Sequence, residues 1–494
     1  MSNTTTITKD IHGKPYKRAL LVLVLVIGSF CTVLNATLLA TAFPAIMQSF
    51  DVDTATVQWL TTGFMLVTGV MIPVSAWLIN TFSSRFIYLL AMTVFLIGTT
   101  LCFIAPSFNY LLVGRLVQGF GVGITMPLLQ TIMLTIFPPE QRGAAMGTVG
   151  LVIGLAPALG PTLSGFIVDT WTWRDLFGMI IPICVVVLIL AFFFMKSVIP
   201  HKEQKIDIWS IITSTIGFGS LLYGTSSAGN KGWTNPYVLA FIIVGVIFVA
   251  LFSHRQLQMS DPFLDISVFK YREFRLASVL SAISNLAMVG AEMILPLYIQ
   301  TIRGESAFHS GLMLLPGALV VGFMSPITGR LFDRYGAKML AITGMTLLSL
   351  ATVPFLFLTP HTSIVLIIGF YMIRMFGIGM VMMTVTTSGM NVLPLDKLPH
   401  GTAVNNTFRQ VLSSIGTAIL ISILTTVTTN HLPAKSLLKT TPLAYKQLAT
   451  DAVLNGYKAA FLMSILFALC SLTLAFFLKK GNIIRKLPVG GAAK

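Results

Sequence analysis

One acidic residue of this chain lies well inside an apolar stretch. The sequence has 16 aspartates and glutamates, and only Glu292 falls in the middle of such a stretch, within residues 276–296. A carboxylate in hydrocarbon is costly, and one that is retained usually faces a cavity or a partner and carries ions or protons. Burial disfavours its charged form, so the group can bind a proton on an acidic side and release it on an alkaline side. We therefore predict that Glu292 couples transport to proton movement, with a hydrogen bond to a neighbouring helix as the alternative role.

Two arginines lie within apolar stretches of the same kind. Arg115 begins the run Arg-Leu-Val-Gln-Gly-Phe-Gly-Val-Gly, and Arg374 begins the run Arg-Met-Phe-Gly-Ile-Gly. A buried guanidinium must find acceptors such as backbone carbonyls or a carboxylate. For Arg374 we favour a structural clamp between helices. Arg409 begins a later apolar stretch near the cytoplasmic face, where it can snorkel to water, and we expect a structural role there too.

The elements that carry these residues are membrane helices. Hydrophobic residues make up 55% of the 494 residues and charged residues 10%, with a mean hydropathy of +0.87, whereas a soluble domain carries about a quarter charged residues. A span needs roughly 20 apolar residues, and fourteen stretches of the sequence qualify. They are too long and too continuous for barrel strands. The sequence predicts an all-α integral membrane protein with fourteen transmembrane helices.

The two arginine segments belong to an internal repeat. A second pair of similar segments, 76–85 and 329–338, follows the second and the tenth stretch, so the repeat offset is eight spans. Two homologous halves of six spans leave two inserted spans, 208–228 and 237–253, between them. Such repeats place a substrate site near the membrane midplane, between halves that rock against each other. The predicted divisions are a tail at 1–18, a first half at 19–200, the inserted pair at 201–260, a second half at 261–480 and a tail at 481–494.

The positive charge of the chain fits a membrane orientation better than a nucleic-acid surface. The net charge is +16, but the lysines and arginines are sorted by loop, and the positive-inside rule then places both termini in the cytoplasm. We expect a multi-pass protein of the cell membrane that contacts the lipid bilayer and binds no nucleic acid. The seven histidines lie in predicted loops or tails, and the four cysteines lie in predicted spans without metal-ligand spacing. The sequence has no phosphate-binding loop, so we expect no enzyme, no metal and no cofactor.

Five motifs occur in order along this frame. They are the loop 329–338, the span-four segment 115–119, the span-five segment 150–165, the segment 173–177 that follows it, and Phe408-Arg409-Gln410. With these motifs the chain resembles the major facilitator superfamily from residue 18 to residue 480, and in particular its fourteen-span drug/proton antiporters. The resemblance implies a major facilitator fold of two six-helix halves plus two inserted spans, a monomer, and alternating access driven by the proton gradient. It also implies a part for Arg115 in proton relay, with a clamp between helices as the alternative.

The chain departs from the family pattern at two places. The first span of this branch usually carries an aspartate, followed two residues later by threonine, where this sequence has Asn35 and Thr37. In the first half's loop motif, Asn80 and Ser83 stand where the family has aspartate and glycine. The first change argues against a proton carrier in the first half. The second weakens the cytoplasmic latch that this motif forms.

The predicted site has three parts. Glu292 and Arg115 form the proton-coupling part. The conformational latch and antiporter motif comprises Gly329, Asp333, Arg334 and Gly336, together with Gly154, Pro157, Gly160 and Pro161 in span five. Met-rich surfaces suit promiscuous binding, and aromatic faces attract organic cations. Repeat logic places near the cavity Asn35, Thr37, Phe64, Met65, Met126, Asn285, Met288 and Met313.

Together these features predict a proton-coupled antiporter that exports lipophilic or cationic drugs and toxic compounds by alternating access. With one acid in mid-span, we expect few protons per cycle and better export of neutral or singly charged compounds than of dications. An exporter dedicated to one endogenous metabolite or lipid is the closest alternative. An uncoupled facilitator or channel would move substrate without a pH gradient, and a transporter-like sensor would bind ligand without flux.

Overall fold

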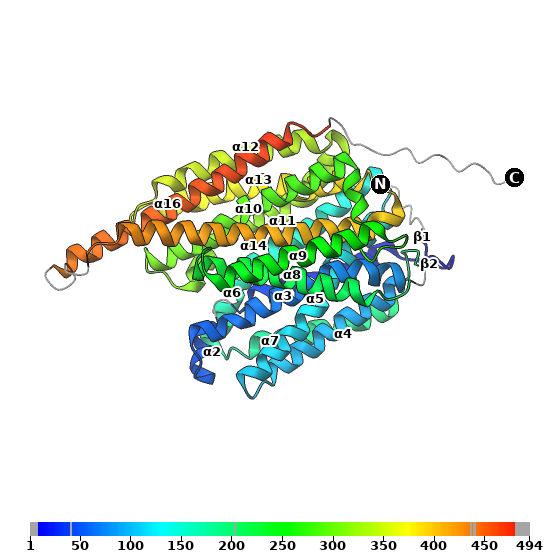
Figure 1. The fold of residues 1–494 in the computed structure, drawn as a ribbon, viewed down its shortest axis with the longest axis horizontal. Helices are drawn as coiled ribbons and strands as arrows, with labels where there is room; N and C mark the ends of the chain where they lie inside the picture. The colour runs from blue at the N-terminus through cyan, green and yellow to red at the C-terminus, as the bar shows by residue number, and fades with distance from the viewer. Residues whose placement is uncertain (1–7, 40–41, 202–203, 435–436, 438–440, 480–494) are drawn as a thin grey trace.

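The computed structural model describes residues 8–479 except 40–41, 202–203, 435–436 and 438–440, and these residues form a long bundle of helices (Figure 1). A small hairpin of β1 (Thr8–Lys9) and β2 (Pro15–Tyr16) precedes the first helix. The predicted all-α class is therefore confirmed.

The helices before and after the inserted pair form two sets. The first set contains α1 (Arg18–Thr37), the short α2 (Phe43–Phe50), α3 (Thr54–Thr81), α4 (Ser84–Phe103), α5 (Phe108–Ile136), η1 (Pro139–Gln141), α6 (Arg142–Thr170) and α7 (Asp175–Phe194). The inserted pair is α8 (Ile208–Lys231) and α9 (Pro236–Gln258), followed by η2 (Ile266–Lys270). The second set contains α10 (Arg272–Thr301), α11 (Ala307–Tyr335), α12 (Ala337–Thr352), η3 (Val353–Phe357), α13 (Ile364–Met390), η4 (Leu395–Lys397), α14 (Leu398–His431) and α16 (Pro442–Ala475).

Within the described residues, thirteen helices are long and apolar enough to cross a membrane. Helix α8 is not among them because its sequence is rich in serine, threonine and glycine. Several helices begin at polar caps: the side chains of Asp53, Ser83 and Ser306 accept hydrogen bonds from backbone N–H groups in the first turns of α3, α4 and α11. Such caps satisfy donors that a helix end leaves free.

Each set of helices has its own apolar core. One core is built mainly from residues of α1 to α7 and the other from α10 to α13 and α16. The two sets meet most extensively along α6 and α11. Glycines permit this close approach, since a Cβ at Gly147 would lie 2.9 Å from Pro326 Cα and one at Gly329 would lie 3.1 Å from Ala144 Cα. Small residues at helix interfaces allow backbones to pack closely in membranes.

The inserted helices α8 and α9 lie side by side (Figure 1), and α8 contacts α3 of the first set and α14 of the second. On the side of the first set, Tyr223 of α8 stacks on Trp59 of α3 with 5.7 Å between ring centroids. On the side of the second set, the hydroxyls of Thr225 and Ser414 are 2.7 Å apart, and Trp233 Nε1 donates to Ser422 Oγ at 3.0 Å. The inserted pair therefore covers the junction of α3 with α14.

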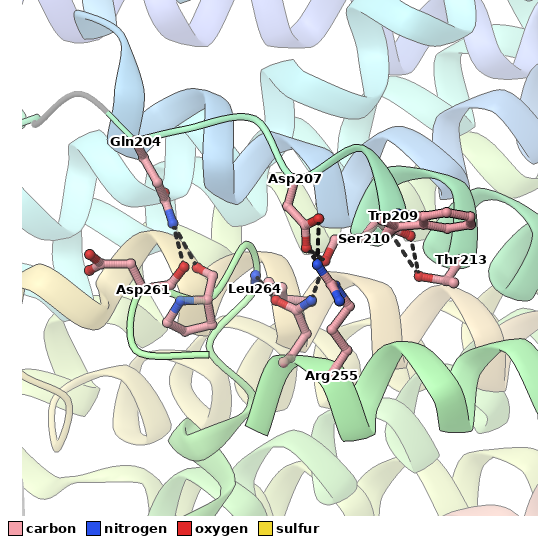
Figure 2. A network of polar contacts seen from close by, with 10 residues as sticks. Gln204, Asp207, Trp209, Ser210, Thr213, Arg255, Asp261 and Leu264 are labelled. Atoms are coloured by element: carbon pink, nitrogen blue, oxygen red, sulfur yellow. Dashed lines mark hydrogen bonds and ion pairs between the residues drawn. The ribbon is translucent and has the colours of Figure 1, made fainter. Parts of the chain in front are cut away.

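Figure 2 shows how the two inserted helices are joined where α8 begins and α9 ends. Arg255 donates from Nε and Nη2 to the two carboxylate oxygens of Asp207, at 2.8 and 2.9 Å. This guanidinium holds the pKa of Asp207 below its usual range. Gln204 donates to the backbone carbonyls of Asp261 and Pro262 at 3.0 and 3.1 Å, which ties the linkers before and after the pair together.

Two expectations from the sequence are wrong. We expected every histidine in a loop or tail and Arg409 at the start of a span, but α14 begins at Leu398. His400 is therefore a buried residue of this helix, and Arg409 is a half-buried residue of its fourth turn. At its far end α14 continues to His431, and it runs beside α16 beyond the other helices (Figure 1). His400 and Thr402 made the start of this helix resemble a loop in the sequence, because their partners Asn80 and Thr131 lie on distant helices.

Candidate functional site

Arg374 of α13 joins three other helices at the centre of the second set. It is fully buried, and its Nη2 donates to the Ala287 carbonyl of α10. Its Nε donates to Thr352 Oγ1 of α12 at 3.1 Å, and Nη2 also donates to Ser464 Oγ of α16 at 3.3 Å. The carbonyl and hydroxyl acceptors satisfy the guanidinium without a carboxylate in direct contact, as expected for the predicted clamp.

Glu292 lies on α10, one turn beyond the carbonyls that Arg374 binds. Its side chain is partly buried, and Arg374 and Tyr371 are its electrostatic neighbours. Among the described residues it makes no hydrogen bond and no ion pair within 4 Å. A carboxyl group near a cation but not locked to it can change protonation state without breaking a contact. This geometry is compatible with the predicted proton carrier.

Arg115 of α5 occupies a similar position at the centre of the first set. It is fully buried, and it donates from Nε to the Leu60 carbonyl of α3 at 3.2 Å and from Nη1 to the Asn35 carbonyl of α1 at 3.4 Å. Nη1 also donates to Gln118 Oε1 at 2.8 Å. The Phe64 ring lies beneath the guanidinium, 4.1 Å from its carbon, which adds a cation–π contact.

Asn35 stands next to this arginine. Its Nδ2 donates to Gln118 Oε1 at 3.1 Å, and Gln118 Nε2 donates onward to Thr99 Oγ1 at 2.8 Å. Two buried atoms of the cluster, Asn35 Oδ1 and Arg115 Nη2, have no hydrogen-bond partner within the described part of the chain. The first set therefore holds a buried cation beside amides, in contrast to the Arg374 region with its nearby carboxyl.

The predicted cavity residues do not gather in one place. Asn35 and Phe64 join Arg115 in the first set, while Asn285 and Met288 line a cavity of about 10 Å³ between α10, α12 and α13, which is room for one water molecule. The remaining members lie apart: Thr37 packs on Gly160, Met65 is 48% exposed, and Met126 and Met313 pack against the separate cores of the two sets.

Asp333 connects the second set to the first. Near the end of α11, its carboxylate accepts hydrogen bonds from the backbone N–H groups of Gly143 and Ala144, at 2.8 and 3.0 Å. These groups lie in the first turn of α6, where a negative charge also interacts favourably with the helix dipole. Gly336 ends α11 with a φ of 77°, a conformation that glycine adopts without strain. Arg334 is exposed, and its guanidinium lies over the Tyr335 ring.

The span-five motif supplies the face of α6 that packs against other helices. Gly154 packs on Val321 of α11, and Gly160 packs on Thr37 of α1. Pro157 and Pro161 lie within α6, which continues through both of them. The motif therefore contacts both sets of helices.

Further polar contacts cross between the sets at the end predicted to be cytoplasmic. Asn406 Nδ2 donates to Gln130 Oε1 at 2.7 Å, and the hydroxyls of Thr131 and Thr402 are 2.8 Å apart. These α14 residues were absent from the predicted site, although their amide and hydroxyl groups inside a helical segment were a signal that could have found them.

Asn80, one of the two departures from the loop motif, takes part in the same closure. Its Nδ2 lies 2.8 Å from Nε2 of His400, whose Nδ1 accepts from Asp265 N at 3.1 Å. The first half's loop motif therefore contacts the second set through a neutral amide. In the part of the chain that the structure describes, no three histidine, cysteine, aspartate or glutamate side chains are placed to hold a metal ion.

Comparisons with known proteins agree with this architecture. The family model described as "Major Facilitator Superfamily" matches residues 25–417. An MFS-type transporter of Bacillus subtilis, YcnB, is 48% identical over 95% of this chain and 97% of its own length.

Two further relatives carry names that refer to drug resistance. The lincomycin resistance protein LmrB of Bacillus subtilis is 39% identical over 95% of this chain and 98% of its own length. The multidrug resistance protein B homolog of Mycobacterium tuberculosis is 28% identical over 83% of this chain and 76% of its own length.

A solved structure shares the fold. The human organic anion transporter MFSD10 (TETRAN) superimposes with a TM-score of 0.66 at 14% identity, covering 92% of this chain and 99% of that one. The family model and the relatives that match nearly the whole chain establish the superfamily that the motifs predicted. The chain belongs to the major facilitator superfamily of multi-pass membrane transporters.

Proposed function

We propose that this transporter is a proton-driven antiporter that exports lipophilic drugs by alternating access. The observation that carries the proposal is Glu292, a carboxyl group inside α10 that has no ion pair among the described residues and lies near Arg374. An ionisable residue in a membrane helix marks an ion or proton pathway by default. The relatives named for lincomycin and multidrug resistance support drugs as substrates.

In the proposed cycle, Glu292 takes a proton from the acidic outer side and gives it up to the cytoplasm. The contacts of Asp333 with α6 and of Asn406 with Gln130 hold the predicted cytoplasmic end closed. These contacts must break when the transporter opens to the cytoplasm. The two sets of helices therefore alternate between an outward-open and an inward-open state, and binding of the proton and of the drug favours opposite states. A cationic drug near Glu292 would compete directly with the proton.

We also propose the finer architecture that the motifs imply. Helix α8 is the fourteenth span, because it runs beside α9 and contacts α3 and α14 along the bundle. Both termini lie in the cytoplasm by the positive-inside rule, the two six-helix halves move against each other, and the monomer is the working unit.

The proposal is tested by uptake of a drug such as lincomycin into everted membrane vesicles from cells that express the protein. We expect respiration to drive uptake and a protonophore to abolish it. Uptake that a protonophore leaves unchanged would identify an uncoupled facilitator instead. Failure of several unrelated lipophilic drugs to compete with one another would favour a dedicated exporter of one metabolite or lipid.

A further inference from the structure

Helix α14 carries a stripe of polar side chains along the face that meets other helices of the junction. Thr402, Asn406, Arg409 and Ser413 follow one another at intervals of four, three and four residues, so they share one helix face. Thr402 contacts Thr131 and Asn406 contacts Gln130, both on α5, while Ser413 accepts from Asn285 of α10 at 3.1 Å. Arg409 therefore lies between the cytoplasmic closure and α10. Polar residues in membrane helices face the bundle interior or a water-filled cavity.

Three hydrogen-bond donors around Arg409 have no acceptor in the described residues. They are Nη1 of Arg409, Nε2 of Gln130 and Nδ2 of Asn405, and all three atoms are shielded from solvent. Gln130 is 0% exposed and Asn405 is 2% exposed.

The side chains that carry these donors are linked through Asn406 and through their spacing on α14. Arg409 Nη2 donates to Asn406 Oδ1 at 2.9 Å, and the same Asn406 donates to Gln130, so one hydrogen-bond chain links the guanidinium to the Gln130 amide. Asn405 precedes Arg409 by four residues, which places the two side chains next to each other on the helix.

The chemistry of this cluster calls for an anionic acceptor. Each buried donor without a partner is costly, more so when it is charged, and within the described part of the chain Arg409 has no ion pair. Glu292 does not serve it, because the charged neighbour of that carboxyl is Arg374. A guanidinium fork with two amide N–H groups matches the oxygens of a carboxylate.

We propose that Arg409, Gln130 and Asn405 form an anion-recognition site that binds the carboxylate of a lipophilic substrate. This inference deepens the proposed function and rests on the chain being a transporter of such compounds. The site lies at the junction of the two sets, since Gln130 belongs to α5 and Arg409 to α14. A carboxylate that binds both would engage Gln130, whose contact with Asn406 helps to close the cytoplasmic end, and it would bias the equilibrium between the two states.

The test is equilibrium binding to the purified full-length protein in detergent, with a naphthyl carboxylate and its neutral carboxamide as matched probes. Wild type is expected to bind the carboxylate roughly tenfold to a hundredfold more tightly, the range that a charged hydrogen-bonded contact supplies. Arg409→Gln should remove this preference, and Arg409→Lys should retain part of it. Equal affinity for the two probes in wild type, or a preference that survives Arg409→Gln, would overturn the proposal and leave water as the partner of these donors.

A second variant guards against misfolding of Arg409 variants. Asn405→Asp adds a carboxylate beside Arg409, so it should keep the protein folded and remove carboxylate binding by occupying the guanidinium from within. Asn235→Asp is the matched control, because it makes the same change at the N-cap of α9, outside the closure and the proposed site, and it should keep the preference. An Asn405→Asp protein that binds the carboxylate like wild type would contradict the site. Proton coupling plays no part in this binding assay, so a negative result here does not contradict the proposed antiport. Likewise, drug uptake in vesicles that proves independent of the proton gradient would not contradict the carboxylate site.

Discussion

Two arginines occupy corresponding places in the two sets of helices, but their surroundings differ. Arg115 and Arg374 are both fully buried, and each donates to backbone carbonyls of neighbouring helices. Beside Arg374 lies the carboxyl of Glu292, whereas beside Arg115 lie the neutral amides of Asn35 and Gln118 and the ring of Phe64.

The different surroundings of the two arginines distinguish a structural clamp from a site that can carry a proton. A clamp between helices requires only a guanidinium and carbonyl acceptors, and both regions have these. A proton carrier requires a group that titrates, and only the Arg374 region supplies a carboxyl. We therefore propose that proton coupling belongs to the second set, and the following experiments test that proposal.

The largest effect is expected when either clamp is removed. Arg374→Ala removes the hydrogen bonds that tie α13 to α10, α12 and α16, and Arg115→Ala removes those that tie α5 to α1 and α3. Each should lower the free energy of unfolding by about 3 kcal/mol, measured as loss of thermal stability in detergent. A variant as stable as wild type would show that its arginine is not a clamp.

Glutamine at the same positions should distinguish the two regions. Arg374→Gln removes the positive charge near Glu292, which makes that carboxyl harder to deprotonate, so the pH of half-maximal drug transport should rise. Arg115→Gln should lower activity without moving the pH profile. Equal shifts from both variants would show that the two arginines act on one carrier and would end the comparison.

Asn35→Asp should make the first set resemble the second. The new carboxylate would lie beside Arg115 Nη2, which has no partner among the described residues, and it would reduce the net positive charge of the interior. Export of a dication relative to a monocation should rise several-fold, measured as efflux under one imposed gradient. An unchanged ratio would mean that the charge at this position does not reach the substrate.

The cytoplasmic latch should also depend more on the second set, through Asp333, than on the first set, through Asn80, but with smaller effects on stability. Asp333→Asn weakens the cap on α6, and a lost cap costs about 0.5–2 kcal/mol, which should raise the population open to the cytoplasm. Alkylation of a Thr402→Cys probe in a Cys470→Ser background reports this opening. Asn80→Ala, the neutral counterpart in the first set, should accelerate alkylation less; a larger effect at Asn80 would reverse the assignment of the main latch.

The smallest effect is expected in the inserted pair. Asp207→Asn removes the ion pair with the exposed Arg255, so stability should fall slightly while transport is unchanged. Because the folded-state pKa of Asp207 is depressed, its contribution is present above the unfolded pKa and disappears as the pH falls through the folded value. Thermal melts of wild type and variant should therefore converge at low pH. A persistent difference would point to a role other than the ion pair.

Local patterns in the sequence predicted the helices, the repeat and the latch, because apolar length and glycine spacing are local properties. The pairing of Asn406 with Gln130 was not predictable in this way, since the partners are 276 residues apart. The same cause hid the true start of α14: His400 and Thr402 satisfy their polar groups on α3 and α5, so the first turns of the helix resembled a loop. The expected single cavity also required knowledge of which helices face each other, and Phe64 instead packs beneath Arg115.

The central claim is that Glu292 of the second set carries the proton. The most direct test is substrate-induced proton movement in proteoliposomes with an imposed pH gradient, comparing wild type, Glu292→Gln and Arg115→Gln. The account predicts that added drug dissipates the gradient with wild type, does so more slowly with Arg115→Gln and does not do so with Glu292→Gln. Drug-induced proton movement that continues unchanged in Glu292→Gln would contradict it.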